Sequence, residues 1–217
     1  MARTQPGWAD VAEIYEAWYQ TSRGRRYDVL EKGLIEESLG PARGRQLLDI
    51  GCGTGHFTRW FRELGWQVWG LDLERKMLSQ ARQLSGNDIV YCWGDAAKLP
   101  FADKSFHFST MITTLESTAR PEKALAEAIR VSRNGIILGV LNSLSLLALG
   151  RRVRAISRAT IFSQTRFYSG PALMSMVRRV SRQLGVRAKM RISSWWKGPF
   201  GQIPLAPFFV LAIELKE

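Results

Sequence analysis

Histidine and cysteine are scarce in this sequence. Its 217 residues include only two cysteines, Cys52 and Cys92, and two histidines, His56 and His107. So few ligands, without a metal-binding spacing, exclude a disulfide framework and a zinc site, and we predict no bound metal. Residues 1–6 lack the apolar run of a secretory signal. We therefore expect a protein of the reducing cytoplasm.

Long apolar runs are also absent. The two longest stretches, 134–149 and 203–213, are too short or too interrupted to cross a bilayer as a helix. Hydrophobic residues nevertheless make up 46% of the chain, and 217 residues suffice to bury a substantial core. We expect one folded domain, 1–217.

The C-terminal part of the chain lacks acidic residues. Residues 128–217 hold 15 of the 31 Lys and Arg residues but only two of the 19 Asp and Glu residues. No carboxylate side chain occurs between Glu127 and Glu214, and the net charge of the whole chain is +12. Such asymmetry points to an anionic partner or surface.

Three partners fit this basic stretch, 128–213. The segment LNSLSLLALGRRVRAISRATIF mixes apolar residues and arginines as an interfacial helix does, and Trp195 and Trp196 could lie at the headgroup level, so an anionic membrane surface is one partner. An acidic protein or an anionic acceptor is the second. Nucleic acid is the least favoured, because few aromatic residues accompany the arginines. A basic surface without a specific partner remains an alternative. The expected location therefore includes peripheral contact with the inner face of the membrane, and the oligomeric state stays open.

Strand and helix patterns alternate through the middle of the chain. Residues 8–40 have helical periodicity, with Gly24 expected to separate two helices. Further helices are expected at 56–64, 75–84, 121–132, about 142–165 and 170–184; strands are expected at 46–50, 67–71, 89–93, 106–112, 135–141, 186–196 and 206–216. Such alternation predicts an α/β fold: a doubly wound, Rossmann-like sheet of seven strands, mostly parallel with an antiparallel final strand, and helices on both faces.

A glycine loop follows the first predicted strand. In LLDIGCGTG, residues 47–55, an apolar run ends in Asp49-Ile50, and Gly51, Gly53 and Gly55 then alternate. Glycines let the backbone turn sharply and approach a ligand closely. In a doubly wound sheet, ligands bind beyond the carboxyl ends of the strands. This loop is therefore a candidate ligand platform.

Acidic residues mark the ends of the first three strands. Asp72 closes the second strand, where a carboxylate can accept hydrogen bonds from both hydroxyls of a ribose. Asp95 follows the third strand, and with the amide of Ala96 it can bind an adenine edge. Asp49, which we expect inside the glycine turn, could hold the loop and attract a cationic or amino group. Each aspartate alone could be a turn or cap residue, but three at one sheet edge favour a nucleoside site.

These motifs resemble the class I S-adenosylmethionine-dependent methyltransferases, in particular the type-11 domain that includes the ubiquinone and menaquinone methyltransferases. The resemblance covers about 45–141 and extends more weakly to 8–40. The motifs that carry it are LLDIGCGTG (47–55), GLDLERKMLSQAR (70–82), GDAAKLPFADKSFHF (94–108) and LAEAIRVSRNGIIL (125–138). The sequence departs from the family at His107, where Asp is usual, and at SRNGII, where the family has Pro-Gly-Gly.

The resemblance implies S-adenosylmethionine as the cofactor and assigns its contacts. Gly51, Gly53 and Gly55 would form the loop under the methionine part, and Asp49 would lie near its ammonium. Further contacts would be made by Asp72 with the ribose, Leu73 and Met77 with the adenine, Asp95 and Ala96 with the adenine edge, and Thr113 with the methyl-transfer site. The chain then divides into a helical cover (1–44), a cofactor core (45–141), a basic helical insertion on the acceptor side (142–185) and a terminal hairpin (186–217).

No catalytic residue is assigned. Methyl transfer from a sulfonium is an in-line displacement, so it depends mainly on proximity and a dry pocket. For a small-molecule or lipid-like acceptor, the candidate binding residues are Tyr15, Trp18, Tyr19, Glu116, Asn142, Arg166 and Tyr168. His56 and His107 are interpreted chiefly as cap or packing residues, although a cofactor contact by His56 is plausible.

Two other functions remain open. A nicotinamide-dependent Rossmann dehydrogenase also has a glycine turn and a ribose carboxylate, but Asp49, Asp95 and the glycine spacing disfavour it. A non-catalytic module could keep the cofactor pocket and act through its basic C-terminal face.

Overall fold

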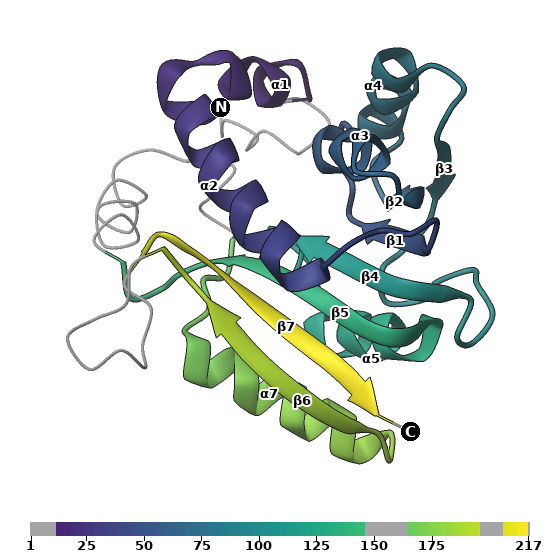
Figure 1. The fold of residues 1–217 in the computed structure, drawn as a ribbon, viewed down its shortest axis with the longest axis vertical. Coiled ribbons are helices and arrows are strands. Elements are labelled where there is room, and N and C mark those ends of the chain that lie inside the picture. The colour runs from purple at the N-terminus through teal and green to yellow at the C-terminus, as the bar shows by residue number, and fades with distance from the viewer. Residues whose placement is uncertain (1–11, 146–164, 196–205, 217) are drawn as a thin grey trace, which may run out of the picture.

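The computed structural model describes residues 12–145, 165–195 and 206–216. Its centre is a seven-stranded sheet in the order β3-β2-β1-β4-β5-β7-β6 (Figure 1). Strand β7 pairs antiparallel with both β5 and β6, whereas the pairs among β1 to β5 are parallel. The strands are β1 (Gln46–Ile50), β2 (Gln67–Asp72), β3 (Val90–Trp93), β4 (Phe106–Ile112), β5 (Ser132–Leu141), β6 (Arg187–Ser193) and β7 (Phe208–Lys216). The predicted fold class is confirmed, including the antiparallel final strand.

Helices cover both faces of this sheet. They are α1 (Ala12–Gln20), α2 (Ser22–Leu39), α3 (His56–Glu63), α4 (Arg75–Ser85), α5 (Pro121–Val131) and α7 (Gly170–Gln183). Helices α2, α3 and α4 contribute to one buried cluster, and α5 and α7 contribute to the other. Helix α7 begins with a proline in its first turn, and the Ser169 hydroxyl accepts a hydrogen bond from the N–H of Ala172.

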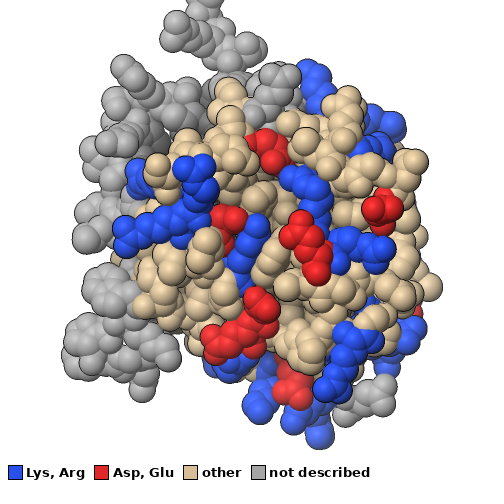
Figure 2. All heavy atoms as spheres, turned by 45° about the horizontal axis from the view of Figure 1, so that its top comes forward, with Lys and Arg blue, Asp and Glu red and all other residues tan. Residues whose placement is uncertain are grey.

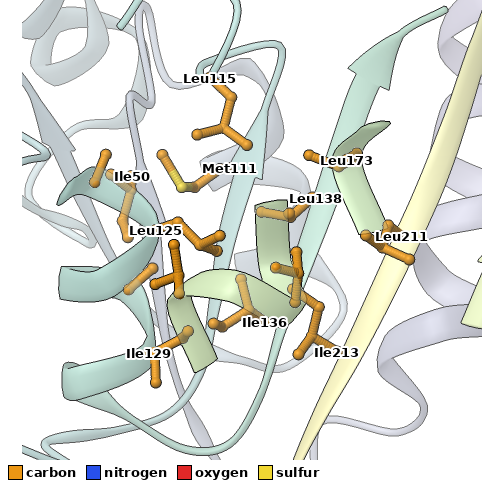
Figure 3. Packing of buried hydrophobic residues seen from close by; sticks show 14 of the residues in the cluster. Ile50, Met111, Leu115, Leu125, Ile129, Ile136, Leu138, Leu173, Leu211 and Ile213 are labelled. Atoms are coloured by element: carbon orange, nitrogen blue, oxygen red, sulfur yellow. The ribbon is translucent and has the colours of Figure 1, made fainter. Parts of the chain in front are cut away.

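The two clusters meet at the sheet because successive strand residues point to opposite faces. On β5, Ile136 and Leu138 pack with α5 and α7, whereas Ile137 packs on the other side. Figure 3 shows the first cluster, where Leu125 of α5 and Leu173 of α7 meet side chains of the central strands. Central strands buried on both faces read as continuous apolar runs, which is why their positions were predictable.

Three local predictions need correction or lie outside the described residues. The first two helices separate at Thr21, which caps α2, and not at Gly24. Gly24 lies in the first turn of α2, where a Cβ would come within 2.0 Å of the Trp18 carbonyl oxygen, so glycine permits close helix packing. Strand β5 begins at Ser132, three residues earlier than expected. The helix expected over about 142–165 lies almost entirely outside the described residues.

None of the helices among the described residues has the length and apolarity needed to cross a membrane.

Candidate functional site

The glycine loop follows β1 at its carboxyl end and is hydrogen-bonded to the end of β2. The N–H groups of Gly51 and Cys52 both donate to the carbonyl oxygen of Leu71, at 2.6 and 3.0 Å. Gly51 has a φ of 71°, and a Cβ there would lie 2.2 Å from Cγ2 of Thr114. Only glycine therefore fits between the end of β1 and the residues that follow β4.

The third glycine has a different role from the first two. Gly55 precedes α3 in the left-handed conformation, and its Cβ would meet the Tyr91 hydroxyl oxygen at 2.4 Å. It does not border the pocket described below. Gly55 thus shapes the loop and its packing, and its predicted cofactor contact stays untested.

Asp72 holds the glycine loop at the end of β2. Its Oδ2 accepts a hydrogen bond from the N–H of Gly53 at 2.8 Å, and its Oδ1 accepts one from the N–H of Glu74 at 2.8 Å. Burial raises the pKa of Asp72, although these two backbone hydrogen bonds oppose that shift. The carboxylate is therefore fixed in orientation at the edge where a ribose is expected.

Asp49 is a buried residue of β1, not a member of the glycine turn itself. The Thr58 hydroxyl donates to its Oδ2 at 2.7 Å, and the Thr110 hydroxyl donates to its Oδ1 at 2.9 Å. Burial raises the pKa of Asp49 to about 6, and the nearby charge of Asp72 acts in the same direction. A cationic ligand group beside Asp49 would favour its ionised form.

Asp95 lies after β3 and faces a basic side chain. Its Oδ1 accepts a hydrogen bond from the N–H of Ala97 at 2.8 Å, and its Oδ2 pairs with the guanidinium of Arg120 at 2.6 Å. Arg120 immediately precedes α5 and was not predicted as a site residue. No local sequence pattern marks it, because its partner is 25 residues away.

These groups surround a pocket of about 290 Å³ at the carboxyl ends of the strands. Nine of the ten predicted cofactor residues border it, all but Gly55: Asp49, Gly51, Gly53, Asp72, Leu73, Met77, Asp95, Ala96 and Thr113. Its remaining lining residues are Tyr15, Cys52, His56, Phe57, Leu71, Glu74, Gly94, Ile112, Thr114, Ser117, Thr118, Ala119 and Arg120. Carboxylates at three strand ends, bare backbone between them and an apolar wall suit a nucleoside with a cationic tail.

Helix α1 covers this pocket and is fastened to the glycine loop. Glu16 accepts a hydrogen bond from the Thr54 hydroxyl at 2.5 Å and pairs with the guanidinium of Arg59 at 3.0 Å. Tyr15 borders the pocket, and its side chain forms a hydrogen bond with that of Thr113. Trp18 and Tyr19 do not border the pocket, and Tyr19 instead packs against Tyr15 and His56.

His56 borders the pocket at the start of α3. Its Nε2 lies 2.6 Å from Oδ1 of Asp28 on α2, and its ring stacks on Tyr19 with centroids 3.7 Å apart. Asp28 was not predicted as part of the site, because nothing local in the sequence joins residues 28 positions apart. His107, by contrast, accepts a hydrogen bond at Nδ1 from the N–H of Gln46, the first residue of β1.

The other candidate acceptor residues meet beside the pocket without bordering it. Glu116 accepts a hydrogen bond from the N–H of Leu141 at 2.6 Å, and its carbonyl oxygen accepts one from the N–H of Arg166. Tyr168 donates to the carbonyl oxygen of Leu115 and forms a bridge with Asn142. The structure thus brings together Glu116, Asn142, Arg166 and Tyr168, from three separate segments.

Glu116 is the most unusual member of this group. Its side chain is buried, and its Oε2 has no hydrogen-bond partner among the described residues. Burial raises the pKa of Glu116 to about 8. A carboxyl group in this state is held neutral near physiological pH.

The fold and the pocket define a Rossmann-like protein with a candidate ligand site at the carboxyl edge of its sheet. Comparison with known proteins narrows this class. Residues 48–139 match the family described as a methyltransferase domain. The core of the chain is therefore similar to methyltransferase domains, and this likeness implies S-adenosylmethionine as the cofactor.

Curated relatives share this core with the chain. A demethylmenaquinone methyltransferase of Renibacterium salmoninarum is 36% identical over 126 residues, which cover 58% of this chain and 50% of that protein. A malonyl-[acyl-carrier protein] O-methyltransferase of Pectobacterium atrosepticum is 38% identical over 102 residues, 46% of this chain and 40% of that protein. The chain thus spans about half the length of the curated relatives that it matches.

Solved structures extend the likeness to nearly the whole chain. One is an S-adenosylmethionine-dependent methyltransferase of Thermotoga maritima, described as a possible histamine N-methyltransferase. It superposes on this chain with a TM-score of 0.73 at 25% sequence identity, and the match covers 97% of this chain and 98% of that protein's chain. An S-adenosylmethionine-dependent methyltransferase of Mesorhizobium loti has a TM-score of 0.65 over 85% of this chain and 97% of its own, at 18% identity, which supports the fold alone.

Proposed function

We propose that this protein transfers a methyl group from S-adenosylmethionine to a small-molecule or lipid-like acceptor. The observation that carries the proposal is the pocket at the strand ends, where Asp49, Asp72 and Asp95 surround the glycine loop. A dinucleotide would bring phosphates against these carboxylates, whereas a sulfonium nucleoside brings positive charge. This contrast favours the methyltransferase over the dehydrogenase alternative.

We assign the cofactor contacts to this chain's residues as follows. Asp72 would hold the ribose hydroxyls, Asp95 and Ala96 the adenine edge, and Leu73 and Met77 the adenine faces. Gly51 and Gly53 would lie beneath the amino-acid tail, whose ammonium Asp49 would neutralise. When bound, the cofactor supplies an activated methyl group. The protein's contribution is to align the acceptor in line with it and to exclude water.

The acceptor is proposed to bind between α1 and the group formed by Glu116, Arg166 and Tyr168. The side chains of Tyr15 and Thr113 are hydrogen-bonded to each other. Their hydroxyl groups can orient a polar nucleophile of the acceptor beside the cofactor pocket. The named relatives act on a demethylmenaquinone and on a malonyl-[acyl-carrier protein]. We therefore propose a quinol-like or acyl-type organic acceptor.

The basic C-terminal half is proposed to serve the same reaction by attracting an anionic surface or partner. Among the described residues, Arg178 and Arg182 of α7 and Arg187 and Lys189 of β6 are exposed. Acidic and basic side chains are interspersed over the face that Figure 2 presents, so the charge asymmetry belongs to the C-terminal elements and not to every face. An anionic membrane face or an acidic protein in the cytoplasm fits this charge.

Two measurements test the proposed function. Calorimetric titration with S-adenosylmethionine and with NAD should detect binding of the former only; binding of NAD alone would overturn the assignment. Transfer of a labelled methyl group is then measured with a reduced demethylnaphthoquinone and with malonyl-acyl-carrier protein. Cofactor binding without transfer to any acceptor would favour the non-catalytic module.

A further inference from the structure

The corner where α1 meets α2 carries exposed apolar side chains. On α1, Ile14 and Trp18 lie one helical turn apart and are 67% and 38% exposed, and on α2 Val29 is 71% exposed. The inward face of α1 is also apolar, because Tyr19 is buried there and Tyr15 borders the pocket. Helix α1 thus has one apolar face packed within the fold and another that faces outward.

Three aromatic rings connect this corner to the segment that follows β6. The ring of Tyr27 on α2 lies 6.4 Å from that of Trp18 and 6.3 Å from that of Trp195, measured between centroids. The guanidinium of Arg23 lies over the Tyr27 ring, 5.8 Å from its centroid. Tryptophan and tyrosine are the residues that membrane-bound proteins place at the level of the lipid headgroups.

The arginines of this corner have no acidic partner among the described residues. Arg23, Arg25 and Arg26 are exposed, and none of the three forms an ion pair in the described part of the chain. Arg25 donates to the carbonyl oxygen of Gln20 at 2.6 Å, a contact that leaves its charge uncompensated. Asp28, the next acid along α2, is already hydrogen-bonded to two other side chains. Three arginines within four residues therefore present positive charge beside exposed apolar groups.

We propose that this α1–α2 corner docks on an anionic membrane surface. The corner consists of Ile14, Trp18, Arg23, Arg25, Arg26 and Val29. Its arginines would bind lipid phosphates, and its apolar side chains would enter the headgroup layer. At 67% and 71% exposed, Ile14 and Val29 project from their helices. A fluid bilayer accepts projecting side chains without a complementary shape, which favours lipid over an acidic protein as the partner.

The docking itself does not depend on the proposed methyl transfer, but it has a consequence for that reaction. Tyr15, on the opposite face of α1 from Ile14, borders the pocket. Since a helix with its side chains is about 10 Å thick, docking would bring the pocket close to the headgroups. A lipid-like acceptor would then reach the pocket directly from the membrane; this consequence rests on the proposed function.

Cosedimentation with lipid vesicles tests the charged part of the corner. The full chain is mixed with vesicles of phosphatidylcholine alone or of phosphatidylcholine with phosphatidylglycerol. The double variant Arg23→Gln, Arg26→Gln is compared with Arg43→Gln, Arg62→Gln, which removes the same charge from exposed sites after α2 and in the last turn of α3. We expect the wild type to bind only the anionic vesicles. The first double variant should bind them roughly 30-fold more weakly, because two basic residues near an anionic surface are lost, and the control should stay within about twofold.

A second pair of variants tests the apolar part. Ile14→Ser removes an exposed apolar side chain from the corner, and Leu84→Ser, at a position 48% exposed on α4, is the matched control. We expect Ile14→Ser to weaken binding to anionic vesicles about fivefold or more, because less apolar area leaves water on docking. Leu84→Ser should bind as the wild type does.

Equal binding of the wild type to both kinds of vesicle, or equal losses in the corner variants and their controls, would overturn the inference. Absence of binding to either vesicle would also overturn it, and retention on immobilised poly-L-glutamate in that case would assign the corner to an acidic protein. Calorimetric titration with S-adenosylmethionine checks that each variant keeps its fold. Failure of the wild type to bind S-adenosylmethionine would instead defeat the proposed function and leave the docking result standing.

Discussion

The Glu116 side chain accepts a hydrogen bond from the backbone N–H of Leu141 at 2.6 Å, so a buried carboxyl group joins the loop after β4 to the end of β5. Its second oxygen has no partner among the described residues. An ionised carboxylate there would carry a buried negative charge with too few hydrogen bonds to stabilise it. The stability of the folded protein should therefore depend on whether the Glu116 carboxyl group is protonated.

Glu116→Gln should flatten the pH dependence of stability. The pKa of Glu116 is raised by burial from its ordinary value of 4.5 to about 8 in the folded protein. Above pH 4.5 the unfolded chain releases this proton and the folded protein keeps it, so the free energy of unfolding falls with rising pH until about pH 8. The whole effect on the free energy of unfolding is at most about 5 kcal/mol. Urea denaturation at pH 5 and pH 8 measures it, with Glu63→Gln, an exposed residue, as the control. Identical slopes for Glu116→Gln and the wild type would show that Glu116 does not retain its proton.

Asp72→Ala should weaken cofactor binding by about 1–3 kcal/mol, because a charged hydrogen-bond acceptor is lost. The same change releases the N–H groups of Gly53 and Glu74, so the glycine loop also loses its anchor. Calorimetric titration with S-adenosylhomocysteine measures the effect, and the exposed Asp88→Ala is the control. Unchanged affinity would remove Asp72 from the cofactor site.

Gly51→Ala should destabilise the protein more than Gly44→Ala. Both glycines have positive φ, 71° and 70°, so both changes carry the backbone strain of about 1 kcal/mol. Only at Gly51 would the new Cβ also collide with Thr114, whereas nothing lies within 4 Å at Gly44. Thermal unfolding of the two variants compares them directly. Equal losses of stability in the two variants would mean that the glycine loop can shift away from Thr114 at no cost in free energy.

Glu16→Gln should loosen α1 from the glycine loop. It removes the charge that pairs with Arg59 while keeping a hydrogen-bond acceptor for Thr54. Because the pair is about one-fifth exposed, the loss should be of order 1 kcal/mol. Limited proteolysis within α1, with Glu36→Gln as the exposed control, should become faster. Unaltered cleavage would indicate that aromatic packing of Tyr15 and Tyr19 alone holds the helix.

Much of the fold and of the candidate cofactor site could be predicted from the sequence. Apolar runs such as Leu47-Leu48 and Ile136-Ile137-Leu138 marked strands buried on both faces, and Asp72 and Asp95 stood at strand ends that parallel pairing brings together. The position of the break between α1 and α2 was not predictable, because Gly24 carries the same local signal whether it ends a helix or permits close packing inside one.

The sequence by itself determined the alternation of strands and helices, the glycine loop and the acids beside it, because periodicity and turn chemistry act over a few residues. The tertiary structure alone decided that Asp28 meets His56, that Glu16 meets Arg59, and that Arg120 meets Asp95. These partners lie 25 to 43 residues apart, and only the packing of α1, α2 and α5 around the sheet brings their charges within hydrogen-bonding distance.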